Sequence, residues 1–131
     1  TAGAHGSTFG GNPLAMAVGK AAFSTISSDE ILNNVNEIAG YLKQQFAGLQ
    51  ERFPDVIAEV RGKGLLMGLK LIPNNRDFMG WARDEAHMLV AGGGDNLVRI
   101  LPPLNITLEE AREAVERLEK TCEFARAQAS A

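Results

Sequence analysis

The sequence has a single cysteine, Cys122, and two histidines, His5 and His87. One cysteine excludes an internal disulfide and a cysteine-based metal cluster. The two histidines are not spaced as metal ligands usually are, so we expect no metal site. His5 stands beside glycine, and a lone histidine in such a setting is more often structural or exposed than an acid–base group.

Long apolar runs and a strong net charge are also absent. No stretch approaches the roughly 18 apolar residues that a membrane span needs, and the opening residues are polar and glycine-rich, unlike a signal peptide. The formal net charge of -3 argues against a large nucleic-acid-binding surface. With so little cysteine, these features fit a reducing compartment. We expect a cytoplasmic protein that contacts neither membrane nor nucleic acid.

The length of 131 residues and the hydrophobic content of 45% are ordinary for one globular domain. The sequence begins with Thr1 rather than Met, and a glycine-rich segment follows directly. We therefore expect this chain to be a piece of a longer protein.

Two helices are predicted in the first half of the chain. Asn12 is a strong N-cap and a proline follows it, which predicts a helix over residues 13–23. Ser27 and Glu30 form a capping box for a second, long amphipathic helix, which Pro54 ends.

Two more helices are predicted in the second half. A short helix is expected over residues 74–86. Thr107 and Glu110 form a capping box at the start of the last helix. The spacing of apolar residues along that helix predicts an inner face of Ala111, Val115, Leu118, Cys122 and Ala125.

Strands are expected between these helices. The pattern predicts strands over 56–61, 64–72, 87–91 and 96–101, with the first pair broken at 62–64 and the second at the glycine triplet 92–94. The order helix, helix, two strands, helix, two strands, helix predicts an α/β fold of the α+β-like kind, with a small sheet packed against helices.

The segment AHGSTFGGNPLAMA, residues 4–17, is the first candidate for chemistry. Its glycines allow a close approach of the backbone, and Ser7 and Thr8 offer hydroxyls beside N–H groups that suit an anion such as phosphate. The alternative is a glycine-rich turn in which Asn12 only caps a helix. The segment matches no P-loop or dinucleotide fingerprint, so the residues alone favour the turn.

Arg99 is the second candidate. Alternation in its predicted strand puts Leu97, Arg99 and Leu101 on one face. A guanidinium between two leucines is costly unless a carboxylate or phosphate pairs with it. The partner is either a structural Asp or Glu from a neighbouring helix or a substrate carboxylate, and the residues alone favour the former. Lys63 and Lys70 have no context typical of a desolvated nucleophile.

Four segments occur in the order of motifs from one enzyme class: HGSTFGGNPLA at 5–15, VRGKGLLMGLKL at 60–71, residues 88–96, and VRILPPLNIT at 98–107. They resemble the class III aminotransferases, which depend on pyridoxal 5'-phosphate (PLP) and have fold type I, and in particular the acetylornithine aminotransferases. The resemblance implies that residues 1–26 are the end of the large domain and the start of the connecting helix. Residues 27–131 would be the small C-terminal domain, with a largely antiparallel sheet.

The resemblance also implies roles for single residues. In such enzymes the Ser-Thr pair, here Ser7 and Thr8, helps to bind the PLP phosphate in the neighbouring subunit of a homodimer, with Thr8 the stronger candidate. The matching arginine, Arg99, binds a carboxylate of the amino acid or oxo acid. The lysine that holds PLP as a Schiff base lies upstream of these motifs, outside the chain, so no catalytic residue is expected here and the chain alone should be inactive.

The resemblance implies that the whole protein transfers the terminal amino group of N-acetylornithine to 2-oxoglutarate in arginine biosynthesis. Ornithine, succinylornithine and 4-aminobutyrate aminotransferases are the alternatives within the class. From another class, the chain would be a free-standing α+β binding module, or a phosphate-binding protein that uses the glycine-rich segment alone.

Overall fold

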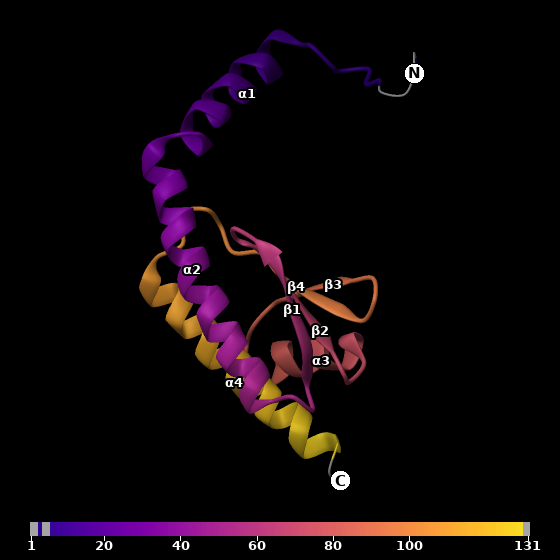
Figure 1. Cartoon of the computed structure of the whole chain (residues 1–131). Helices are drawn as coiled ribbons and strands as arrows, with labels where there is room; N and C mark the ends of the chain where they lie inside the picture. The colour runs from indigo at the N-terminus through magenta and orange to yellow at the C-terminus, as the bar shows by residue number, and fades with distance from the viewer. Residues whose placement is uncertain (1–2, 4–5, 130–131) are drawn as a thin grey trace. The chain divides into compact units, whose positions relative to one another are not determined.

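The computed structural model describes residue 3 and residues 6–129 (Figure 1). The chain divides into two units, residues 1–33 and 34–131, and each is described by itself. In the first unit, helix α1 (Pro13–Ile26) starts where the sequence predicts it and runs three residues past the predicted end at 23. Asn12 caps α1, because its Oδ1 accepts a hydrogen bond of 2.9 Å from the N–H of Ala15.

The predicted capping box of Ser27 and Glu30 is wrong by one residue. Ser27 closes α1 instead, since its N–H and its hydroxyl both donate to the carbonyl of Phe23, at 3.0 and 2.7 Å. Helix α2 (Asp29–Arg52) begins after Ser28, whose Oγ accepts from the N–H of Ile31 at 3.4 Å. A serine pair offers two candidate caps, and the sequence pattern did not distinguish them.

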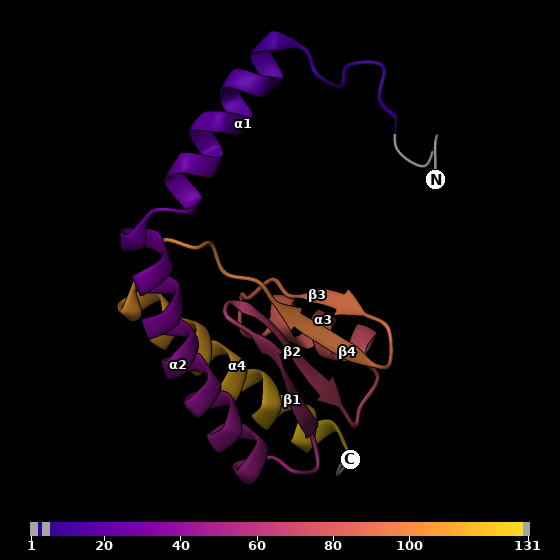
Figure 2. The ribbon, with the colours of Figure 1, turned by 45° about the horizontal axis from the view of Figure 1, so that its top comes forward.

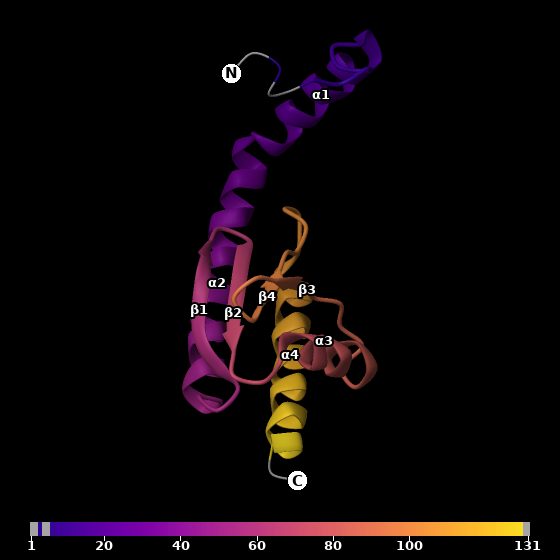
Figure 3. The same cartoon turned by 90° about the vertical axis from the view of Figure 1, so that its right-hand side faces the viewer.

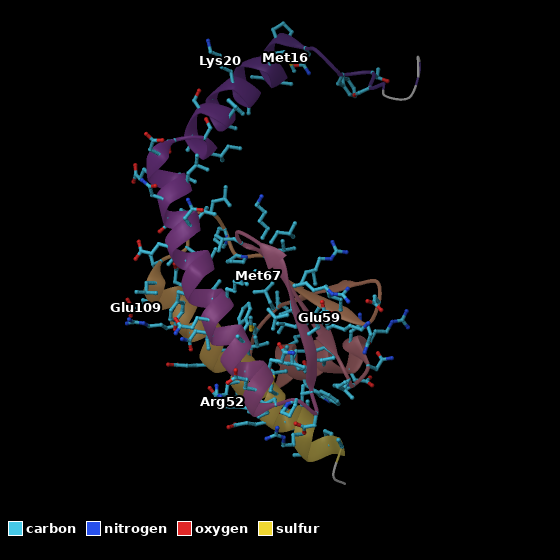
Figure 4. The ribbon with its side chains drawn as sticks, in the orientation of Figure 1. Met16, Lys20, Arg52, Glu59, Met67 and Glu109 are labelled. Carbon is cyan, nitrogen blue, oxygen red and sulfur yellow. The ribbon has the colours of Figure 1, made fainter. Side chains whose placement is uncertain are left out.

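No residue of α1 is buried. The side chains of Met16 and Lys20 stand out from the helix (Figure 4). Its large apolar side chains, each between 49% and 74% exposed, are Leu14, Met16, Val18, Phe23 and Ile26.

The second unit contains one antiparallel sheet in the order β1-β2-β4-β3, whose strands Figure 2 shows side by side. Its strands are β1 (Ile57–Lys63), β2 (Leu66–Leu71), β3 (Ala91–Gly93) and β4 (Leu97–Ile100). The small antiparallel sheet that the sequence and the resemblance predict is therefore confirmed.

The predicted strand over 87–91 is wrong except at its last residue. His87 has a φ of 52°, which a strand does not allow. The N–H of Met88 donates to the carbonyl of Ala82 at 2.8 Å, so this backbone closes the preceding helix. The glycine triplet does not separate the strands either, because Gly92 and Gly93 belong to β3 and the turn spans 94–96.

Three helices complete the second unit: α2 from Asn34 onward, α3 (Asn75–Asp84) and α4 (Leu108–Ala129). Figure 3 shows α3 beside α4. Helix α2 contacts the β1–β2 hairpin, because Nε2 of Gln50 donates to the carbonyl of Ala58 at 2.9 Å. Trp81 and Phe124 join α3 to α4, with ring centroids 6.0 Å apart. The inner face of the sheet and the helices share one core, whose largest fully buried side chains include Phe46, Phe78, Ile38, Leu42, Leu49, Leu69, Val98 and Leu118.

The start of α4 matches its prediction. The N–H of Glu110 donates to Oγ1 of Thr107 at 3.2 Å, and the N–H of Thr107 donates to the Glu110 carboxylate at 2.8 Å. The capping box is therefore confirmed, and all five residues of the predicted inner face are buried. Within the described residues, none of the helices combines the length and the apolar character required to cross a membrane.

Candidate functional site

Arg99 lies on the face of the sheet that is turned away from the core, called the outer face below. In β4 it is opposite Gly68 of β2 on one side and Ala91 of β3 on the other. Its neighbours Val98 and Ile100 are buried, whereas Arg99 is exposed. Because successive side chains of a strand alternate between the two faces, the Arg99 side chain projects from the outer face.

No carboxylate neutralises Arg99 within the described part of the chain, where its guanidinium has neither an ion pair nor a hydrogen bond. The structural Asp or Glu partner favoured from the residues alone is therefore not found among residues 6–129. The two flanking leucines do not enclose the group, since Leu97 is half-buried and Leu101 is 52% exposed. The guanidinium is therefore exposed and available to an anion.

A shallow cavity of about 280 Å³ lies beside Arg99 on the outer face. The side chain of Arg99 passes over Gly93, because a Cβ placed on that glycine would lie 3.2 Å from Nε of Arg99. The cavity combines two guanidiniums with an apolar wall, and its lining residues are Arg61, Gly62, Leu66, Met67, Gly68, Leu97 and Arg99.

The two arginines of this cavity differ in their charge environment. Arg61 is paired with Glu59 at 2.7 Å and with Asp95 at 3.1 Å, and both carboxylates raise its pKa. Lys70 Nζ lies 3.0 Å from each Asp95 oxygen, and Lys70, followed by Arg61, lowers the pKa of Asp95. Arg61 is thus compensated by its own neighbours, which leaves Arg99 as the arginine of this cavity with no such partner.

Sequence reasoning missed this charge cluster. The signal was present, because alternation along β1 puts Glu59 and Arg61 on one face (Glu59 is labelled in Figure 4). What the pattern lacked was the register that sets Arg61 opposite Gly68 and so brings it to the same cavity as Arg99.

Ser7 and Thr8 lie in the first unit, in a turn that precedes α1. The N–H of Gly10 donates to the carbonyl of Ser7 at 3.1 Å, and the N–H of Phe9 donates to Oγ of Ser7 at 3.3 Å. Both residues are exposed, and in the described part of the chain the Thr8 hydroxyl has no hydrogen-bond partner. Each hydroxyl keeps a proton that it can donate to a phosphate oxygen, so these residues fit the phosphate of PLP.

The remaining candidate groups carry no site. His5 lies outside the described residues. Within the described ranges no three His, Cys, Asp or Glu side chains gather as metal ligands would. Cys122 is buried, and burial raises the pKa of its thiol to about 12, which keeps it protonated and unreactive.

Comparisons with known proteins place these features in context. Residues 1–122 match the family model described as aminotransferase class-III. The chain is 67% identical over its full length to acetylornithine aminotransferase 2 of Caulobacter vibrioides, of which it covers 32%. It is 50% identical over 123 residues to the acetylornithine aminotransferase of Brucella melitensis, which is 94% of this chain and 30% of that protein. The chain thus spans 30–32% of the length of these curated relatives.

Solved aminotransferase structures also match this chain over nearly its full length. The ornithine aminotransferase of Toxoplasma gondii, whose crystal structure has PLP at partial occupancy in the active site, matches 100% of this chain and 32% of its own. Its TM-score is 0.86 at 28% identity. The acetylornithine aminotransferase of Elizabethkingia anophelis matches 93% of this chain and 33% of its own, with a TM-score of 0.80 at 32% identity.

Proposed function

Because this chain belongs to the class-III aminotransferases, we propose that it is the C-terminal part of a PLP-dependent enzyme that moves the terminal amino group of N-acetylornithine to 2-oxoglutarate. The family match confirms the resemblance drawn from the four motifs, and the structural similarity confirms the fold class as part of a fold-type I enzyme. The names of the Caulobacter and Brucella relatives support the choice of donor. Arginine biosynthesis in the cytoplasm is the setting that this reaction implies.

The domain organisation is part of the proposal. Residues 1–26 would close the large domain and start the connecting helix, and residues 27–131 would form the small domain. The exposed apolar side chains of α1 support this division, because they need a covering that the first unit does not supply. In the whole protein that covering would come from the rest of the large domain and from the second subunit of a homodimer.

The observation that carries the proposal is the guanidinium of Arg99, which has no carboxylate partner in the described chain and stands at a cavity on the outer face. A guanidinium in this setting binds a carboxylate through paired charge-assisted hydrogen bonds. Both the proposed donor and the proposed acceptor carry a carboxylate. Arg99 would therefore hold each substrate in turn and orient it for transfer of the amino group.

Ser7 and Thr8 would hold the PLP phosphate of the neighbouring subunit through their hydroxyls, with Thr8 the stronger donor. When bound, this cofactor supplies the electron sink that amino-group transfer requires. The lysine that anchors it would lie upstream of Ser7, in the part of the protein outside this chain. We therefore expect the 131-residue chain alone to be inactive.

The test is a transamination assay on the whole protein with N-acetylornithine and 2-oxoglutarate, run beside the 131-residue chain. We expect the whole protein to be active and the chain to be inactive. Arg99→Ala in the whole protein should lower kcat/KM by about 10- to 100-fold, because a hydrogen bond to a charged group contributes about 1.5–3 kcal/mol.

Arg61→Ala is the matched control, since Arg61 lines the same cavity but is already paired with two carboxylates. Its kcat/KM should stay within about threefold of the unmodified protein. Equal losses for both variants would contradict the role given to Arg99. If the whole protein turned over ornithine, succinylornithine or 4-aminobutyrate faster than N-acetylornithine, the proposed enzyme class would stand but the proposed amino donor would be wrong.

A further inference from the structure

Asn96 makes the densest set of hydrogen bonds near Arg99. Its Nδ2 donates to the carbonyls of Leu71 and Pro73, each at 2.8 Å. Its Oδ1 accepts from the N–H of Asn75 at 2.8 Å. Its own carbonyl accepts from the N–H of Leu71 at 3.0 Å. One residue thus ties the turn before β4 to the end of β2 and to the start of α3.

Asn75, at the start of α3, makes further hydrogen bonds to the strands on either side of this turn. Its Nδ2 donates to the carbonyls of Gly93 and Leu97, each at 3.1 Å. Gly93 ends β3 and Leu97 begins β4, and the two residues face each other across the sheet. The side-chain amide of Asn75 therefore links the two strands of the β3–β4 hairpin where they meet the turn.

The backbone at the turn explains why asparagine stands there. Asp95 and Asn96 have φ values of 59° and 54°, in the left-handed region that asparagine adopts more readily than most residues. The turn therefore needs both a left-handed conformation and a side-chain amide. Glycine at position 96 would supply the first without the second.

The hairpin carries Arg99 and directs its side chain. Arg99 is the third residue after Asn96, and its Nε passes over Gly93 at the other end of the same turn. A shift of the hairpin against β2 would move the guanidinium along the outer face, away from its place opposite Gly68.

We propose that Asn96, assisted by Asn75, is a positioning residue that fixes Arg99 for carboxylate binding. The inference rests on the proposed function, since it needs Arg99 to bind the substrate carboxylate. The side-chain amide of Asn96 is engaged by backbone groups of the protein, so it would not bind substrate directly. It acts by holding the register and direction of β4.

The test measures KM and kcat of the whole protein for N-acetylornithine and 2-oxoglutarate. Asn96→Gly keeps the backbone conformation and removes the amide. It should raise KM for both substrates about tenfold and leave kcat within about twofold, because the displaced group binds ground state and transition state alike. In the Arg99→Ala background, Asn96→Gly should have no further effect on KM, since the residue it positions is gone.

Val115→Ala is the matched control, because it removes core packing on α4, an element to which Asn96 makes none of its hydrogen bonds, and so lowers thermal stability without removing those bonds. Its KM should not change. If Asn96→Gly lowers Tm as Val115→Ala does and leaves KM unchanged, Asn96 is only structural and the inference is overturned. If Arg99→Ala itself leaves KM unchanged, the proposed function of Arg99 fails as well, so the two failures are distinguishable.

Asn75→Ala keeps the test valid should Asn96→Gly fail to fold. It removes the bridge to Gly93 and Leu97 but retains the backbone N–H that bonds Asn96. KM should rise about threefold, with faster amide hydrogen exchange across residues 93–99. Unchanged KM in this variant overturns the inference.

Discussion

Two phenylalanines on successive helices show how differently the two units of the chain are built. Phe46 of α2 is 1% exposed, whereas Phe23 of α1 is 68% exposed. Both belong to well-formed helices, α1 capped by Asn12 and α2 by Ser28, so local helix formation does not separate them. The difference lies in what covers the apolar surface after the helix has formed.

The distribution of apolar residues explains that difference. On α2 the buried residues fall on one face, with charged residues on the others, which is typical of a helix that packs on its own domain. Apart from Lys20, α1 carries no charged residue, and its apolar side chains occupy every side. A helix that is apolar all round is typical of a protein interior. The second unit closes its own core, while α1 has the composition of a helix whose covering lies elsewhere.

The largest expected effect is the difference in unfolding free energy between alanine substitutions of Phe46 and Phe23. In the 131-residue chain, Phe46→Ala should lower the free energy of unfolding by about 3–5 kcal/mol, because it removes a fully buried ring and leaves a cavity in the core. Phe23→Ala should change it by less than about 0.5 kcal/mol, since the side chain is already hydrated. Urea unfolding followed by circular dichroism and by Trp81 fluorescence measures both.

The same two substitutions, made in the whole protein, test whether α1 is covered there. If upstream chain covers α1 there, Phe23→Ala should become destabilising by about 2–4 kcal/mol, and Phe46→Ala should keep its cost. A cost for Phe23→Ala that stays near zero at both chain lengths would contradict the covering of α1.

The helix caps provide a smaller comparison. Thr107→Ala breaks the capping box of α4 and should cost about 1 kcal/mol in the unfolding of the second unit. Asn12→Ala removes the cap of α1, but it should leave that transition unchanged and lower only the helix signal at 222 nm. Equal shifts of the unfolding midpoint would show that α1 unfolds together with the packed core.

Patterns with a local cause were predictable from the sequence. The capping box of Thr107 and Glu110 and the inner face of α4 depend only on residues within one helix, and both are observed. The motifs also identified the enzyme class, since most of the chain matches it. The roles of Ser7, Thr8 and Arg99 stay predictions.

Features that depend on partners distant in sequence were not predictable. The strand expected at 87–91 has the right composition, but its backbone is used to close α3. The pairing of Arg61 with Asp95 needs the register of three strands, and the bonds of Asn96 need three chain segments to meet. A sequence pattern shows which face a residue occupies, but not which residue stands across from it.

The smallest expected effect concerns the charges around Arg61. The hydrogen bond from Lys70, and next that from Arg61, holds the pKa of the Asp95 carboxyl below its ordinary value of about 3.9. A carboxyl whose pKa is lower in the folded state stabilises the fold above the unfolded pKa, and that contribution is lost as the pH falls through the folded pKa. Asp95→Asn should therefore be slightly less stable than the unmodified chain at pH 7, and the difference should shrink as the pH falls below the ordinary value and towards the folded pKa.

The effect is small because Asp95 is 57% exposed and its ion pairs are screened by water. Urea midpoints of both proteins at pH 7 and pH 3, at low salt and in 1 M NaCl, measure it. High salt at pH 7 should reduce the difference as acid does, since both weaken the same exposed ion pairs. A difference that neither acid nor high salt reduces would show that Asp95 does not stabilise the fold through its charge. Such a result would separate the charge cluster on the outer face from the hydrogen bonds that hold the hairpin.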